Sequence, residues 1–325
     1  MSTTHSPYAH GPASVRATMF RVLAALVPAL AVLVWYSQGA ILLPLVLSSA
    51  ACLALEAVCL KLRARPWRND GSALLTAWLL TLCLPVVTPW WLVLTTALIA
   101  IVFAKHLYGG LGQNPFNPAM AAFCVAIVAA PGIMAQHLPP HAMSALEQIR
   151  IILGLDAREV LDGIASATPL NALSNALHHD DTHAADFADT LATPLALICA
   201  YALGGLWLVR ARIIDWRTPL VFLATLFLLA TLPWWIAPAR YPSPLFHLLH
   251  PSTMLAAFFI LTDPVTGCTT ARGKCLLAAC AALIVWLIRS HGAYPDGIAF
   301  SVLLMNFCAP FIDLHTQPKA FGHER

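Results

Sequence analysis

The sequence has few charged residues. Asp, Glu, Lys and Arg make up 10% of its 325 residues, whereas 59% are hydrophobic. Soluble domains carry roughly 25% charged residues, so this composition excludes an ordinary soluble protein and indicates a membrane protein. The formal net charge of +3 is too small to indicate a nucleic-acid partner.

Metal-binding and disulfide motifs are also lacking. None of the nine cysteines forms a CxxC pair, and most lie inside apolar runs as small buried side chains do. Histidines 178, 179 and 183 cluster in a charged loop without the spacing of a metal site, so we expect no bound metal. The first 20 residues lack the apolar segment and cleavage site of a signal peptide, so the first span is expected to remain in the mature protein.

Apolar runs fill most of the chain. We expect an all-α, polytopic membrane protein with about ten transmembrane helices. Several runs are shorter than the ~20 residues that a full span needs, so their helices must extend into polar flanks, be broken, or be buried by other segments. The runs cover residues 20–35, 40–60, 73–87, 90–103, 118–134, 191–209, 219–236, 251–261, 275–288 and 297–312.

The basic residues orient these spans. Most Lys and Arg of the loops fall at 61–68, 105, 210–217 and 272–274, on the same side as both termini if there are ten spans. Cytoplasmic loops are enriched in Lys and Arg, so we expect both termini in the cytoplasm. Segment 136–190 then lies outside, and it holds eight of the fifteen acidic residues.

The chain therefore divides into a cytoplasmic tail (1–17), a five-helix bundle (18–135), the outer segment (136–190), a second five-helix bundle (191–313) and a cytoplasmic tail (314–325). A half with an odd number of helices reappears in the opposite orientation, as in inverted-repeat transporters. The sequence supports such a repeat only weakly, through NPFNPAM before the fifth helix and LTDPVTG after the eighth.

The outer segment contains an amphipathic pattern over 143–160, which predicts a helix over this range, although Gly154 within it is an unfavourable residue for a helix. The apolar positions, spaced by three and four, are Leu146, Ile149, Leu153, Ala157 and Val160.

The stretch DGIASATPLNAL, residues 162–173, follows this pattern. Thr168 and Pro169 suit the cap and first position of a short helix, with Leu170 and Leu173 on one face. Thr168 is then either a simple cap, or part of a helix start that holds a phosphate.

Four motifs, in order along the chain, resemble the D subunit of the Rnf electron-transport complex, which is related to the B subunit of the sodium-pumping NADH:quinone reductase. They are DGSALLTAWLLTLCLPVVTPWW from residue 70, KHLYGGLGQNPFNPAMAAF from 105, FFILTDPVTGCTTARGK from 258 and GAYPDGIAFSVLLMN from 292. Together they cover nearly the whole membrane region.

The resemblance implies a covalent FMN on the outer face. In that family the FMN phosphate is esterified to a Thr within Ser/Thr-Gly-Ala-Thr after an Asp-rich start, and a flavin transferase attaches it. Thr168 matches the attachment residue, with Asp162, Ser166 and Ala167 as neighbouring site residues. Ala165 and Ser166 depart from the pattern, because they stand where a hydroxyl residue and Gly are usual.

Further polar residues are candidates for a second site. Asn114 and Asn117 either cap the helix at Pro118 or belong to a broken-helix site for an ion or a second, non-covalent flavin. Glu56, Asp70 and Asp263 are candidates for an ion path. The alternatives are that Asp70 caps a helix and that Glu56 and Asp263 pair with nearby basic residues, Arg272 or Lys274 in the case of Asp263.

By resemblance, we expect a subunit of an ion-translocating NADH:ferredoxin oxidoreductase in a bacterial inner membrane, relaying electrons through FMN with coupled Na⁺ or H⁺ transport. The chain has no nucleotide-binding fold or iron–sulfur Cys pattern, so it requires the other Rnf subunits for catalysis. Two alternatives are the B subunit of the quinone reductase, and a flavin-free channel or secondary transporter in which Thr168 only caps a helix.

Overall fold

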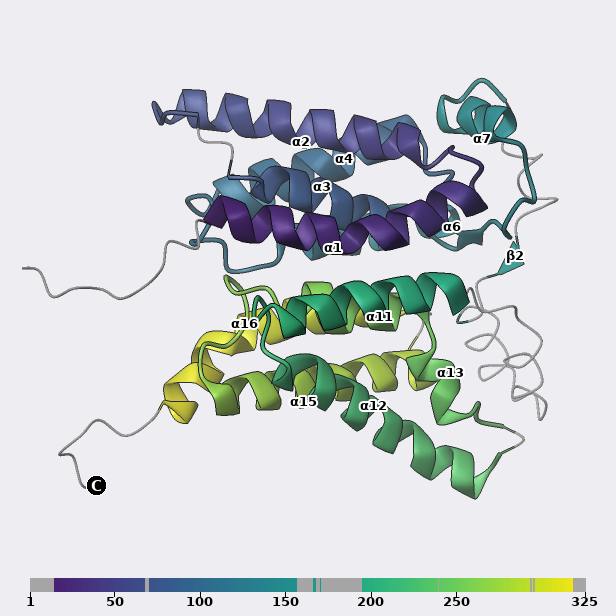
Figure 1. Ribbon diagram of the computed structural model, residues 1–325, viewed down its shortest axis with the longest axis vertical. Coiled ribbons are helices and arrows are strands. Elements are labelled where there is room, and N and C mark those ends of the chain that lie inside the picture. The colour runs from purple at the N-terminus through teal and green to yellow at the C-terminus, as the bar shows by residue number, and fades with distance from the viewer. Residues whose placement is uncertain are drawn as a thin grey trace, which may run out of the picture.

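The computed structural model is a helical bundle in two halves, α1–α7 and α11–α16, packed against each other (Figure 1). It describes residues 15–67, 70–156, 166–167, 170, 195–238, 240–292, 294 and 296–317. The first half contains α1 (Val15–Tyr36), α2 (Leu42–Leu62), α3 (Ser72–Cys83), α4 (Trp90–Leu98), η1 (Ile99–His106), α5 (Pro118–Ala129), α6 (Pro131–Met134) and α7 (Ala145–Ile152). The second contains α11 (Leu195–Arg210), α12 (Arg217–Ile236), α13 (Pro244–Leu248), α14 (Pro251–Leu255), η2 (Ala256–Ile260), α15 (Ala271–His291) and α16 (Ile298–Thr316).

A helix lies within each of the predicted apolar runs, which confirms the helical, multi-span class. Among the described residues, α1, α2, α12, α15 and α16 are long and apolar enough to cross a membrane. The remaining apolar helices are shorter within the described residues, and Pro or turn residues follow the ends of α3, η1, α5 and η2. Strand structure in the described residues is limited to β1 (Gln136–His137) paired antiparallel with β2 (Ser166–Ala167).

The ends of the bundle are distinct. Figure 1 shows that α1 begins and α16 ends at one end, whereas α7 and β2 lie at the other. The first end carries the predicted cytoplasmic loops, and the second carries the described part of the predicted outer segment.

The two halves meet along α1 and α11. At Gly204, an added Cβ would lie 2.1 Å from the carbonyl oxygen of Ala25, and at Gly205 it would lie 2.2 Å from the Phe258 ring. Small residues at helix interfaces of membrane proteins let backbones approach closely. Gly204 therefore sets the distance between the halves, and Gly205 sets the distance between α11 and η2 within the second half.

Two helices change to π-helical geometry as they approach the inner end. α4 continues as η1 into the turn-rich loop 107–117, and α14 continues as η2 into loop 261–270. π-helical turns are rare and often occur at functional sites. Both loops contribute to the inner cavity described below.

Helix α7 differs from the prediction. It covers only Ala145–Ile152, because Gly154 ends it with a φ of 73°. The predicted apolar face points outward, with Leu146 and Leu153 exposed, and the buried residues are Gln148, Ile151 and Ile152. In a membrane protein lipid also accommodates apolar residues, so periodicity alone does not identify the side that faces the protein.

Candidate functional site

Two cavities lie at opposite ends of the described bundle, and we name them for the predicted orientation. The inner cavity, of about 100 Å³, lies where α1 and α3 begin and is bordered by the loops after η1 and η2. The outer cavity, of about 490 Å³, lies where α1 and α3 end. The inner cavity is lined by three of the predicted site residues, Asn114, Asn117 and Asp263, whereas the described lining of the outer cavity contains none of them.

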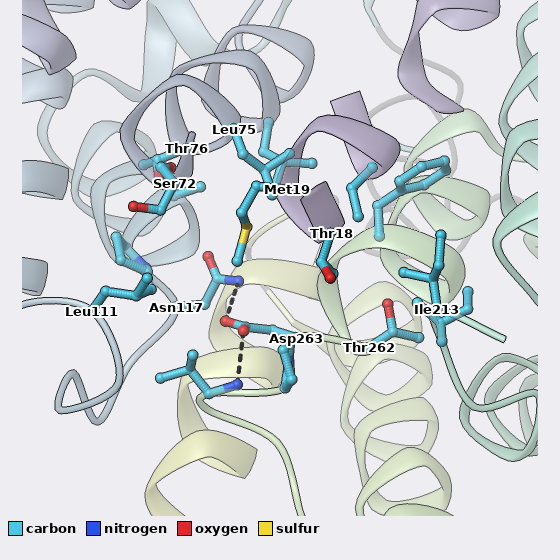
Figure 2. A pocket seen from close by; sticks show the side chains of 18 of the residues that line it. Thr18, Met19, Ser72, Leu75, Thr76, Leu111, Asn117, Ile213, Thr262 and Asp263 are labelled. Carbon is cyan, nitrogen blue, oxygen red and sulfur yellow. Dashed lines mark hydrogen bonds between the residues drawn. The ribbon is translucent and has the colours of Figure 1, made fainter. Parts of the chain in front are cut away.

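Asp263 and Asn117 face each other in the inner cavity (Figure 2). The Asn117 amide donates to Asp263 Oδ2 over 3.3 Å, and Thr266 Oγ1 donates to the same oxygen over 2.9 Å. The backbone N–H of Val265 donates to Asp263 Oδ1 over 3.0 Å. The alternative ion pair with Arg272 or Lys274 is not formed among the described residues, and the Lys274 ammonium instead contacts Asp215 at 3.4 Å.

Asn117 also caps α5, as predicted: its side chain accepts from the backbone N–H of Met120 over 3.2 Å. Its own backbone N–H donates to Asn306 Oδ1 over 3.0 Å, and Asn306 Nδ2 donates to the carbonyl of Thr266 over 3.1 Å. Asn306 of α16 thus joins the two cavity loops. Asn306 is not among the site residues predicted from the sequence. Its polar amide within an apolar helix was a signal that could have identified it.

Asn114 is buried in the wall of the inner cavity. Its Nδ2 donates to the carbonyl of Phe116 over 3.0 Å, whereas its Oδ1 has no hydrogen-bond partner among the described residues. An unsatisfied buried acceptor costs roughly 1–3 kcal/mol. The geometry therefore suits a cavity ligand that is a cation or carries a hydrogen-bond donor.

A buried charge network adjoins this cavity. The Lys105 ammonium contacts Glu56 Oε1 at 2.5 Å and donates to Ser72 Oγ over 2.7 Å. Ser72 Oγ in turn donates to Asp70 Oδ1 over 2.5 Å, at the start of α3 where Asp70 was predicted to cap. The sequence predicts Lys105 in a cytoplasmic loop. The structure instead buries it in η1, because Glu56 on α2 lies opposite.

The outer cavity is lined mainly by apolar and aromatic side chains from both halves. Thr168 and Asp162 lie outside the described residues. Their described neighbours nevertheless lie at this cavity, since Ala167 pairs with Gln136, and both Gln136 and Leu170 line the wall. The backbone of Ser166 pairs with His137 in the same way.

A buried arginine supports the second-half wall of the outer cavity. Arg289 on α15 donates to Asp296 Oδ1 over 3.1 Å, to Ser252 Oγ over 3.3 Å and to Thr253 Oγ1 over 3.0 Å. Asp296 and Ser252 line the cavity. The network thereby fixes the starts of α14 and α16 around the cavity.

The NQR2, RnfD, RnfE family model matches residues 2–322 of this chain. The chain belongs to this family. Relatives named as the D subunit of an ion-translocating oxidoreductase complex include proteins of Escherichia fergusonii (41% identical over 344 residues), Citrobacter koseri (40% over 344) and Shigella boydii (40% over 346). In each of these comparisons 98% of this chain and 98% of the relative are aligned.

The motifs that resemble this family contribute residues to both cavities. Asp263 and Asn117 come from two of them and meet in the inner cavity. The motif from residue 292 supplies Asn306 at the inner end and Asp296 at the outer end.

Proposed function

We propose that this chain is the D subunit of an ion-translocating oxidoreductase complex in a bacterial inner membrane, and that it relays electrons through an FMN esterified to Thr168. The outer cavity is the observation that carries the proposal, because the strand leading to Thr168 pairs with a residue of its wall. Other subunits of the complex deliver and remove the electrons, and the electron flow is coupled to transport of Na⁺ or H⁺.

The outer cavity fits the ring of a flavin. Its volume of about 490 Å³ lies within the range of small-molecule sites, roughly 300–1,000 Å³. Tyr36, Tyr201 and Phe123 give it an aromatic lining. Gln148 Oε1 is buried and without a hydrogen-bond partner in the described part of the chain, as an acceptor for a ring N–H requires.

The FMN supplies the redox chemistry, and the protein sets its place and surroundings. The apolar wall limits the access of water to the ring. Arg289 and Asp296 hold one part of this wall in position, through a contact of 3.1 Å between them. A covalent tether keeps the group on the outer face, where a dissociable flavin would be lost.

Flavin fluorescence in a denaturing gel tests the anchor. The chain is produced in a host that carries the flavin transferase, as wild type, Thr168→Val and Ser166→Ala. We expect fluorescent wild type and Ser166→Ala, and a dark Thr168→Val variant. A dark wild type would favour the flavin-free transporter, whereas fluorescence in all three would mean that another residue is the anchor.

We propose that the inner cavity holds the second cofactor or the translocated ion, with Asn114, Asn117 and Asp263 as ligands and Glu56 and Asp70 beside the path. The Asn114 Oδ1, which no described residue pairs, supports both alternatives. An Asn114→Leu variant distinguishes them. Loss of acid-extractable flavin from the purified complex identifies a flavin site, whereas unchanged flavin with weaker sodium dependence of turnover in vesicles identifies an ion site.

We also propose ten membrane crossings arranged as two inverted repeats, with both termini in the cytoplasm. One short element of each half supports the repeat, because the two elements end on opposite sides of the bundle. In the first half α3 ends at the outer cavity in loop 84–89, and in the second half η2 ends at the inner cavity in loop 261–267. A green fluorescent protein fused to the C-terminus should fluoresce and an alkaline phosphatase fusion should be inactive. The reverse result would overturn this orientation.

A further inference from the structure

The amide of Gln148 is held in one orientation at the wall of the outer cavity. Its helix, α7, is fixed by a capping box in which Glu147 Oε2 accepts from the backbone N–H of Ser144 over 2.8 Å. Gln148 is 1% exposed, and its Nε2 donates to the carbonyls of Met143 over 2.9 Å and Ser37 over 3.2 Å. Reversing the amide would place its oxygen against two carbonyl oxygens, so Oε1 stays on the opposite side.

Gln148 Oε1 is left without a hydrogen-bond partner among the described residues, although Gln148 lines the outer cavity. Buried polar atoms in folded proteins are almost always paired. The acceptor is therefore complementary to a ligand that brings a donor into the cavity. An anion is unsuitable at this position, because a carbonyl oxygen repels it.

We propose that Gln148 Oε1 accepts a hydrogen bond from the ring N–H of the flavin and so holds the isoalloxazine in the outer cavity. This inference rests on the proposed attachment of FMN at Thr168. The oxidised isoalloxazine carries one N–H, between two ring carbonyls, and that edge matches a carbonyl acceptor. The phosphate end is excluded from Gln148 by charge and belongs to the anchor.

Gln148 also ties the cavity to the bundle. Through Ser37 its amide connects α7 to the residue that follows α1, and Ser37 and Tyr36 line the same cavity. The acceptor is thus placed by rigid elements of the first half. Asp296 and Ser252 lie in the wall that comes from the second half.

The test uses the flavinylated complex and measures iodide quenching of the covalently bound flavin. Gln148→Met removes the acceptor, and Gln148→Glu keeps a carbonyl acceptor because a buried carboxyl group stays protonated. Loss of one neutral hydrogen bond raises the ratio of solvent-exposed to cavity-bound flavin ring by roughly fivefold. We therefore expect the quenching constant to rise about fivefold in Gln148→Met and to stay near wild type in Gln148→Glu.

Covalent flavin content, read by in-gel fluorescence, should be equal in wild type and both variants. Leu146→Ala, at an exposed position of the same helix, is the control and should leave iodide quenching unchanged. Equal quenching in wild type and Gln148→Met overturns the role of Gln148 and leaves the anchor intact. An equal rise in both Gln148 variants also overturns it, because that result reports a disturbed fold. A wild type without covalent flavin overturns the proposed function itself.

Discussion

Removing the Lys105 ammonium, as in Lys105→Met, should destabilise the protein more than any change of a surface charge. Lys105 and Glu56 are both buried, and their 2.5 Å contact is the only hydrogen bond of the Glu56 carboxylate among the described residues. His106 Nε2 lies 3.7 Å from the same oxygen, beyond hydrogen-bond distance. The variant leaves a buried carboxylate without its cation, and such changes cost about 3–5 kcal/mol.

The double variant Glu56→Gln/Lys105→Met should be less affected than the sum of the single variants, because it removes both charges together. Heat denaturation in detergent, followed by the loss of the monodisperse size-exclusion peak, measures the effect. At roughly 2–4 °C per kcal/mol, the midpoint should fall by about 10 °C in Lys105→Met.

Arg150→Met is the matched control, because the Arg150–Asp156 pair of 2.8 Å is exposed. Exposed pairs contribute about 0–1 kcal/mol, so its midpoint should fall by no more than roughly 3 °C. A Lys105→Met midpoint equal to that of wild type would refute the reasoning. A double variant as unstable as the sum of both single variants would show that the two charges do not stabilise each other.

Two further predictions concern helix packing and pH. Gly205→Leu should abolish the monodisperse size-exclusion peak, because the Cβ alone would lie 2.2 Å from Phe258, whereas exposed Leu203→Ala should leave it unchanged. Partial burial acts to raise the pKa of Asp215, but the backbone N–H of Arg217 and the Lys274 ammonium hold the pKa below 3.8. This carboxylate therefore stabilises the fold at neutral pH and loses that effect as the pH falls below 3.8. Asp215→Asn should reduce the free energy of unfolding at pH 7 by less than about 1 kcal/mol and so lower the denaturation midpoint slightly. The difference from wild type should vanish in acid, and a difference that stays constant with pH would contradict this.

Local features of the fold could be predicted from the sequence because neighbouring residues determine them. Asn117 and Pro118 start α5 as expected, and Asp70 accepts hydrogen bonds at the start of α3. Long-range pairing could not be predicted in this way. Lys105 and Glu56 are 49 positions apart in the chain, and only the packing of η1 against α2 brings them together.

The candidate sites show the same difference between local features, which the sequence predicts, and long-range contacts, which it does not. The motifs identified Asn117 and Asp263 as separate candidates, but their contact joins positions 146 apart. Gln148 gave no signal, because a single Gln next to charged residues resembles a solvated helix face. Its burial depends on α7 turning its Leu146 side outward, and the sequence pattern is equally consistent with either orientation.

Two helices, α3 and α5, contribute to the walls of both cavities, and this bears on the proposed coupling of electron flow to ion movement. The N-terminal part of α3 lines the inner cavity at Ser72, and its C-terminal end lines the outer cavity at Cys83. α5 contributes Pro118 to the inner cavity and Phe123 to the outer one. Coupling between two sites requires an element whose arrangement both ligands bias. We propose α3 and α5 as such elements, because a displacement of either one would change both cavities at once.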